Sequence, residues 1–318
     1  MRCGNFAGAC SERDHRRLVP GGAAAGKGCG KSVKRLRRGI LLLALGVAAL
    51  LFLFPTVLTV VNSFLSEGEI QQTYGAALGD RTTEYMAQTV VPKLIPDQVS
   101  AQQYQTFLVE SPEDLGKFWN SVLYVVPITL LQTAVAALAA YGFSRYNGKV
   151  RSAIFFFYVA LMLMPYQVTL VPNYLVSKWL GIYDTGWAIC LPGIFSPFGV
   201  YLLTRYMRRI PKAFVEAAQL DGAGEWKIFT RIYLPQCKSA LYAVGLLVFF
   251  DYWNMVEQPM VLLESEEKFP LSLYLSTINQ NQVGVAFAAA VIYFIPCLLL
   301  FLHGEQYLEE SAAAGGIK

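Results

Sequence analysis

RYMRRIPKAFVEAAQLDGAGEWKIFTRIYLPQCKS, residues 205–239, is a polar stretch of mixed charge that lies between two long apolar runs. It contains the pattern Glu-Ala-Ala, three residues, Gly, nine residues, Ile, one residue, Leu-Pro. Seven fixed positions of this kind would match by chance in such a chain with a probability on the order of 10⁻⁵. The matching positions are Glu216, Ala217, Ala218, Gly222, Ile232, Leu234 and Pro235.

Local signals divide this stretch into two short helices. Pro211 breaks the helix before it and can occupy the first position of a new helix over residues 212–220. Gly222 can adopt the left-handed conformation that ends such a helix. A second helix over residues 225–232 is expected to end before Pro235. The stretch therefore predicts a bent pair of helices outside the bilayer.

The rest of the chain has the composition of a membrane protein. Hydrophobic residues make up 55% of the 318 residues and charged residues 15%, and the apolar residues fall in long uncharged blocks. A helix needs about 20 apolar residues to cross about 30 Å of hydrocarbon. We therefore predict an all-α membrane protein with a transmembrane domain over residues 39–310. Its six predicted transmembrane helices lie in residues 39–66, 118–144, 152–177, 185–204, 239–263 and 285–302.

The distribution of charge predicts the orientation of these helices. Residues 1–38 carry ten Lys and Arg against two acids and are predicted to form a disordered basic tail. The loop 67–117 holds eight acids and three bases, whereas residues 205–238 are rich in Lys and Arg. Under the positive-inside rule, both termini and residues 205–238 are cytoplasmic and the loop 67–117 is extracellular. Residues 311–318 form a short cytoplasmic tail, so the topology is N-in and C-in.

The sequence lacks the usual signatures of an enzyme. The six cysteines are scattered without a CxxC pair, and His15 and His303 stand alone, so neither a metal site nor a catalytic residue is expected. Residues 25–32 resemble a relaxed phosphate-binding loop, but neither a buried strand before them nor a helix after them is predicted. We therefore expect no cofactor to be bound by this chain.

One face of the first short helix is suited to docking. Phe214, Ala217, Ala218 and Asp221 recur at helical spacing, and the two alanines let a partner backbone approach closely. Glu216 lies at the rim of this face, where it can meet a basic group. The alternative is an interfacial helix that anchors on lipid headgroups, for which Lys or Trp would be the better residues. Alanine is a weak residue for such an anchor, and the resemblance described next favours docking to a cytoplasmic protein.

At these residues the chain resembles the permease subunits of ATP-binding-cassette (ABC) importers, whose cytoplasmic loop carries Glu-Ala-Ala, then Gly, then Ile-x-Leu-Pro. Residues 162–192 and 199–223 resemble the carbohydrate-importer branch, in particular the maltose-type second permease. The motifs Trp119-Asn120-Ser121, Tyr252-Trp253-Asn254 with Pro259, and Phe269-Pro270-Leu271 fit the same branch. The likeness extends from about residue 39 to the end of the chain; Ser239 departs from it, because the family usually has Pro there.

The resemblance implies a non-catalytic transport subunit of a bacterial cell membrane. Its expected partners are a second six-helix permease chain, two cytoplasmic ATPase subunits that use ATP and Mg²⁺, and an extracellular solute-binding protein. No nucleic acid is expected among them. In that family the loop between transmembrane helices 4 and 5, here called the EAA loop (residues 205–238), sits in a groove of the ATPase and transmits its motion. The implied ATPase-coupling residues are Phe214, Glu216, Ala217, Ala218, Asp221 and Gly222.

Polar residues inside the apolar runs are candidates for the solute path. Asp251 and Asn254 are the strongest, and Gln167 and Gln132 are weaker, because a mid-membrane ionisable residue is costly and often functional. The alternative for Asp251 is a hydrogen bond to a neighbouring helix that only fixes packing.

Two other functions remain open at this point. One is an ABC importer permease for a solute other than a sugar, since the sequence does not identify the cargo. The other is an ion-coupled secondary transporter that works without an ATPase and uses Asp251 and Glu257 as its coupling sites.

Overall fold

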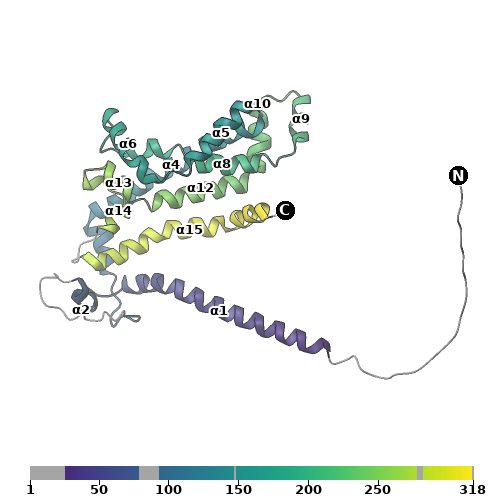
Figure 1. The fold of residues 1–318 in the computed structure, drawn as a ribbon. Coiled ribbons are helices and arrows are strands. Elements are labelled where there is room, and N and C mark those ends of the chain that lie inside the picture. Colours follow the sequence, from purple (N-terminus) through teal and green to yellow (C-terminus); the bar gives the residue numbers. More distant parts are fainter. Residues whose placement is uncertain (1–25, 79–92, 147, 278–281, 317–318) are drawn as a thin grey trace, which may run out of the picture. The chain divides into compact units, whose positions relative to one another are not determined.

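The computed structural model describes residues 26–78, 93–146, 148–277 and 282–316, which are helical with connecting loops and contain no strand (Figure 1). The chain divides into two compact units, Met1–Thr56 and Val57–Lys318. The helices are α1 (Gly26–Asn62), α2 (Glu67–Leu78), α3 (Gln102–Gln105), α4 (Pro112–Arg145), α5 (Lys149–Leu161), α6 (Tyr166–Trp179), α7 (Gly186–Gly193), α8 (Pro197–Met207), α9 (Lys212–Leu220), α10 (Glu225–Ile228), α11 (Leu234–Gln236), α12 (Lys238–Trp253), α13 (Glu257–Leu262), α14 (Leu271–Ser276) and α15 (Val283–Gly316).

Helix α1 begins in the first unit and contains the first transmembrane segment, Arg37–Asn62. Residues 26–38 are helical, whereas the sequence predicts a disordered tail up to residue 38. Lys and Arg are good helix formers, so the helix that the apolar run nucleates extends back through the basic residues. Residues 1–25, which hold the rest of the predicted tail and the start of the phosphate-loop pattern, lie outside the described residues.

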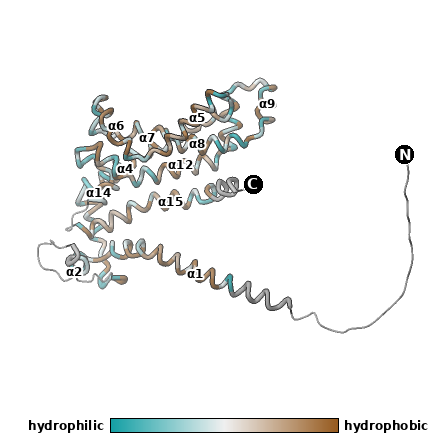
Figure 2. Tube along the Cα trace, viewed as in Figure 1, coloured by the Kyte–Doolittle hydropathy of each residue, from teal (hydrophilic) through white to brown (hydrophobic). Residues whose placement is uncertain are grey.

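The second unit is built around α4, which packs against α8 and α12, and α12 packs in turn against α15 (Figure 1). Small residues bring α4 and α8 together: Ala136, Ala137 and Ala140 are buried, and a Cβ on Gly199 would lie 3.3 Å from Ala136. Small residues at such positions allow close packing of transmembrane helices. Figure 2 shows hydrophobic residues along the middle of α15 and a mixture of hydrophilic and hydrophobic residues at α9.

Helices α12 and α15 approach each other most closely at a glycine. A Cβ added to Gly304 would lie 2.1 Å from Cε1 of Tyr242. The Tyr242 hydroxyl donates a hydrogen bond to the Leu300 carbonyl oxygen at 3.2 Å, and its ring packs on Tyr307 with centroids 4.8 Å apart. The ring is therefore held in place, and α15 carries glycine where the ring meets it.

One of the six predicted spans is bent, and a second bend lies between the EAA loop and the fifth span. The run 152–177, predicted as one transmembrane helix, forms α5 and α6 with an angle of 99° between them. The break precedes Pro165, which has an extended conformation with ψ of 143° and cannot continue the hydrogen-bonded turns of α5. A second bend of 77° separates residues 225–236 from α12. By length and composition, the described residues contain four helices that could cross a membrane, or up to six if each bent pair is one span.

The predicted loop 67–117 holds α2, α3 and a π-helical turn, Thr106–Glu110, within its described residues. Residues 79–92 lie outside the described range. The Glu69 carboxylate accepts hydrogen bonds from Lys93 Nζ at 3.0 Å and from the Asp97 and Ser66 backbone N–H groups. The lysine contact lowers the pKa of Glu69 to about 2, so this carboxylate ties the two described parts of the loop together while it is ionised.

The two ends of α4 contact different loops. Near its start, Asn120 Nδ2 donates to the Glu267 carbonyl oxygen at 2.7 Å, and the Tyr124 hydroxyl donates to the Lys268 carbonyl oxygen at 2.9 Å. At its end, Arg145 Nη2 lies 3.3 Å from a carboxylate oxygen of Glu225 in α10. The loop between α13 and α14 and the EAA loop are therefore held at opposite ends of α4.

Candidate functional site

The EAA loop has the first helix and the turn that the sequence predicts. Helix α9 spans Lys212–Leu220, and Gly222 has φ of +72°. The Ala223 N–H bonds the Ala218 carbonyl oxygen at 2.9 Å, which closes the wide hydrogen-bonded ring of a glycine-terminated helix. A residue with a Cβ would be strained at this φ, so the glycine is required for the chain to reverse into α10.

The second helix of the loop is longer than predicted. It runs from α10 through a π-helical turn, Phe229–Tyr233, into α11, and Pro235 lies inside it rather than after it. In the π turn the Leu234 N–H bonds Phe229, five residues back. This wider turn accommodates the proline ring, which would clash with the carbonyl four residues back in a regular helix. The chain bends instead at Cys237, where α12 begins.

Burial defines which face of α9 is free in this chain. Val215 is buried in the core of the second unit, and Ala218 packs partly against the same core. Phe214 is 55% exposed and Leu220 is 90% exposed, and Ala217 and Asp221 are also exposed. The predicted face is thus divided, because Ala218 turns toward the chain's own core. We call the exposed residues Phe214, Ala217, Leu220 and Asp221 the docking face.

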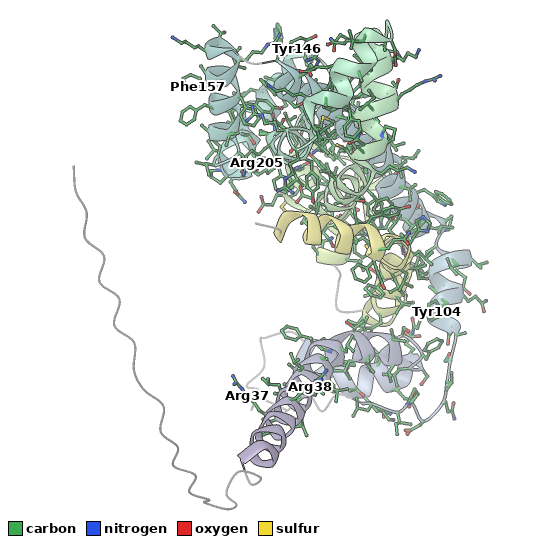
Figure 3. All side chains as sticks on the ribbon, turned by 90° about the vertical axis from the view of Figure 1, so that its right-hand side faces the viewer. Arg37, Arg38, Tyr104, Tyr146, Phe157 and Arg205 are labelled. Carbon is green, nitrogen blue, oxygen red and sulfur yellow. The ribbon has the colours of Figure 1, made fainter. Side chains whose placement is uncertain are left out.

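A partly buried contact that the sequence does not reveal fixes the loop to α4. The Tyr141 hydroxyl and Arg145 both bond the Glu225 carboxylate, and the Tyr141 ring packs on Phe229 and Tyr233 with centroids 5.1 and 4.9 Å apart. These residues are about 80 positions apart in the chain, so no local pattern could pair them. The start of α10 is therefore anchored at the end of α4. Tyr146, the residue that follows α4, is labelled in Figure 3.

Glu216 lies beside a basic pocket of about 250 Å³ between α9 and the ends of α4 and α8. Arg145, Arg208 and Lys212 line this pocket with Glu216. Glu216 is exposed and forms no ion pair with any residue that the structure describes. Its carboxylate therefore remains available to a partner at the rim of the docking face.

The candidate solute path is a pocket of about 790 Å³, here called the α12–α13 pocket. Asp251 and Asn254 line it at the end of α12, together with Glu257 at the start of α13. Gln167 lies next to its wall, and its Nε2 donates to both Glu257 carboxylate oxygens at 3.1 and 2.9 Å. The structure thus brings three of the four predicted path residues to one place.

Gln132 does not belong to this place. It is 3% exposed on α4, is absent from the pocket wall, and its Oε1 has no hydrogen-bond partner among the described residues. The periodicity of α4 carries no signal for this, because which face of a buried helix meets a pocket depends on its neighbours. Asp251, in contrast, forms no side-chain hydrogen bond with another described residue, so the bond expected from a packing role is missing.

The wall formed by α13 is held by hydrogen bonds between Asp184 and residues 262–268, here called the Asp184 clasp. Asp184 has φ of +56°, and its carboxylate accepts hydrogen bonds from the Glu264 and Ser265 backbone N–H groups at 2.9 and 3.0 Å and from Lys268 Nζ at 2.6 Å. Its own N–H bonds the Leu262 carbonyl oxygen at 3.1 Å. The clasp therefore fixes the loop that follows α13 to the loop that follows α6. Lys268 and the backbone donors hold the pKa of Asp184 well below its ordinary value of 3.8.

Asp184→Asn is expected to lower the melting temperature at neutral pH. The variant should also lack the part of the native protein's stability that is lost when the Asp184 carboxylate becomes protonated in acid. Because the folded-state pKa is depressed, the ionised carboxylate stabilises the fold above its ordinary pKa and loses this effect as pH falls through the depressed pKa. The difference in melting temperature between native and variant should stay constant down to about pH 5 and shrink below it. Asn tolerates the positive φ, so backbone strain is matched. A difference that does not change with pH would contradict the clasp.

Comparison with known proteins places these features in a family. A family model described as "Binding-protein-dependent transport system inner membrane component" matches residues 132–310. A lactose transport system permease protein from Rhizobium radiobacter is 27% identical over 273 residues, which are 84% of this chain and 92% of the relative. A probable ABC transporter permease protein from Bacillus subtilis is 33% identical over 210 residues, 63% of this chain and 69% of the relative.

Solved structures show the same fold. A chain in the crystal structure of a bacterial ABC transporter involved in the import of the acidic polysaccharide alginate superposes with a TM-score of 0.73 at 22% identity, over 87% of this chain and 98% of that one. The all-helical fold with the EAA loop is therefore that of an ABC importer permease. Because the family model covers more than half of the sequence, the chain belongs to the family of binding-protein-dependent transport system inner membrane components and is a multi-pass membrane protein.

Proposed function

We propose that this chain is the non-catalytic, membrane-spanning subunit of an ATP-driven importer that moves a sugar or oligosaccharide delivered by an extracellular solute-binding protein. The observation that carries this proposal is the position of α12, which begins directly after the EAA loop and brings Asp251 and Tyr252, near its end, to the α12–α13 pocket. One continuous helix thus connects the end of the EAA loop to the pocket. A displacement of the loop can be transmitted to the pocket through this helix and its packing on α4.

The cargo follows from the relatives and from the chemistry of the pocket. The matched relatives include permeases named for lactose, for arabinooligosaccharides and for diacetylchitobiose. The pocket wall combines Tyr166 and Tyr252 with the amide groups of Asn173, Asn254 and Gln258. Hydroxyl-rich solutes are bound by amides and carboxylates beside aromatic faces. These features support a carbohydrate as the solute.

The partners in this proposal are a second permease chain, two ATPase subunits that bind ATP and Mg²⁺, and the solute-binding protein. In this proposal the EAA loop and both termini lie on the cytoplasmic side, where the docking face would meet the ATPase. The loop between α13 and α14, at the other end of α4, then faces the solute-binding protein.

The test is uptake by vesicles that contain the complete importer and its solute-binding protein. Labelled disaccharide or oligosaccharide should accumulate when ATP is enclosed with the ATPase subunits, and the accumulation should stop with a non-hydrolysable nucleotide. A proton gradient without nucleotide should give no uptake. Uptake that follows the proton gradient in the absence of ATP would overturn the proposal and favour an ion-coupled transporter.

A further inference from the structure

The α12–α13 pocket carries negative charge without a matching positive charge. Its sixteen lining residues include two carboxylates, Asp251 and Glu257, and no Lys, Arg or His, among the part of the chain that the structure describes. The remaining polar lining groups are neutral hydroxyls and amides. A solute in this pocket therefore meets both hydrogen-bond donors and acceptors, but the only charged groups that it meets among the described residues are negative.

The cations on the surrounding helices lie away from this wall. On α6, Lys178 lies near the last residue of the helix, whereas the pocket is lined by Tyr166, Thr169 and Asn173 nearer its start. Lys178 Nζ lies over the rings of Tyr174 and Tyr183, 4.6 and 4.8 Å from their centroids. The basic residues of α5, α8 and α12 lie at the helix ends next to the EAA loop, at Lys149, Arg151, Arg205 and Lys238.

No basic side chain that the structure describes pairs with either of the two carboxylates. Both side chains are exposed. Glu257 is held by the Gln167 amide, a neutral donor, which orients the carboxylate without cancelling its charge. Asp251 bonds no other described side chain, and Lys268, the basic residue that follows α13, is paired with Asp184 in the clasp. Nothing described in this chain neutralises the wall.

We propose that the α12–α13 pocket selects by charge: it accepts uncharged sugars and sugars that carry an ammonium group, and it rejects anionic sugars such as uronate chains. Asp251 and Glu257 are the specificity-determining residues. An anionic group within a few ångströms of two like charges is repelled, whereas hydroxyl and ammonium donors bond the same carboxylates. This inference rests on the proposed function, because it assigns the cargo class to the pocket of that importer.

The test measures the electrostatic potential of the pocket and needs no knowledge of the natural solute. Asn254→Cys is introduced into the chain within its complete importer, and the thiol is treated with a cationic trimethylammonioethyl methanethiosulfonate or an anionic sulfonatoethyl methanethiosulfonate. Mass spectrometry of the peptide that contains residue 254 follows each reaction. Each rate is divided by the rate of the same reagent with 2-mercaptoethanol, which removes intrinsic differences between the reagents.

The cationic reagent is expected to react roughly tenfold faster than the anionic one after this normalisation. The isosteric variants Asp251→Asn and Glu257→Gln, added together to Asn254→Cys, should bring the ratio close to one. High salt should reduce the ratio in the native background and leave it unchanged in the neutral one.

A ratio near one in the native background, a ratio that the two neutral variants do not change, or no reaction with either reagent would overturn the proposal. The importer that retains Asn254, prepared in the same way, is assayed for ATP-driven uptake. If uptake is intact and the ratio is near one, charge selection fails and the importer function stands. If the ratio is as expected but uptake does not depend on ATP, the proposed function fails and the anionic pocket stands.

Discussion

Trp253→Ala is expected to lower the free energy of unfolding by about 3–5 kcal/mol, the usual effect of removing a large aromatic side chain from a core. Trp253 is 1% exposed at the end of α12. Its ring stacks on Phe249 and Tyr293, with centroids 5.1 and 5.3 Å apart, and meets Phe118 edge-on at 6.0 Å. The substitution would leave a cavity where α4, α12 and α15 meet.

Hydrogen bonds add to the expected effect. Trp253 Nε1 donates to the Tyr293 carbonyl oxygen at 3.1 Å, and the Tyr293 hydroxyl donates to the Trp253 carbonyl oxygen at 2.5 Å. The alanine variant loses the first bond, and a typical intramolecular hydrogen bond contributes about 0.5–1.5 kcal/mol. Because Asn254 accepts a bond from the same tyrosine hydroxyl, loosening this contact should also disturb the pocket.

The measurement is chemical and thermal unfolding of the detergent-solubilised protein. Unfolding is monitored by the helical signal in circular dichroism, because tryptophan fluorescence would itself change with the substitution. Trp187→Ala is the matched control, because Trp187 is 61% exposed on α7 and its removal leaves no internal cavity. The control should stay within about 0.5 kcal/mol of the native protein. Equal effects of the two variants would show that the α4, α12 and α15 contact does not stabilise the fold.

The parts of the molecule that were predictable from the sequence are those with local causes. Pro211 and Gly222 delimit α9 because each restricts or permits a backbone conformation wherever it stands, and the observed helix has the predicted bounds. The long apolar runs likewise indicate, from their composition alone, that these helices lie in a lipid bilayer. The all-helical membrane fold follows from these two kinds of signal.

The parts that were not predictable depend on neighbours in space. A run of apolar residues has the same hydropathy whether its helix is straight or bent. Hydropathy therefore does not predict the angle of 99° between α5 and α6. Leu220 was missed as a member of the docking face because only the burial of Val215 shows which way α9 is turned. The bond of Glu225 to Tyr141 joins segments far apart in the chain. Gln132 was polar in an apolar run, as a path residue would be, but its helix turns it away from the pocket.

Ala217→Trp is expected to weaken the association with the ATPase subunits by roughly tenfold or more, because a bulky ring in a close-packed interface costs about 1–3 kcal/mol. Ala217 lies on the docking face, between Phe214 and Leu220, and is exposed in this chain. The added ring therefore meets nothing in the second unit, and the fold should keep its melting temperature. The loss should appear in two measurements: the amount of ATPase that co-purifies with the tagged chain, and the ATP hydrolysis stimulated by loaded solute-binding protein.

The control is the same substitution on the same helix, Gln219→Trp. Residue 219 is also exposed, but it lies about 200° around the helix from Ala217, on the side of the buried Val215 rather than on the docking face. It adds the same ring at the same distance from the bilayer, so effects of tryptophan on membranes or expression are matched. If docking uses the face defined by burial, only Ala217→Trp separates the ATPase. Equal losses from both variants, or no loss from either, would mean that α9 does not meet the ATPase through this face, and the link from the EAA loop along α12 to the pocket would have to begin elsewhere on the loop.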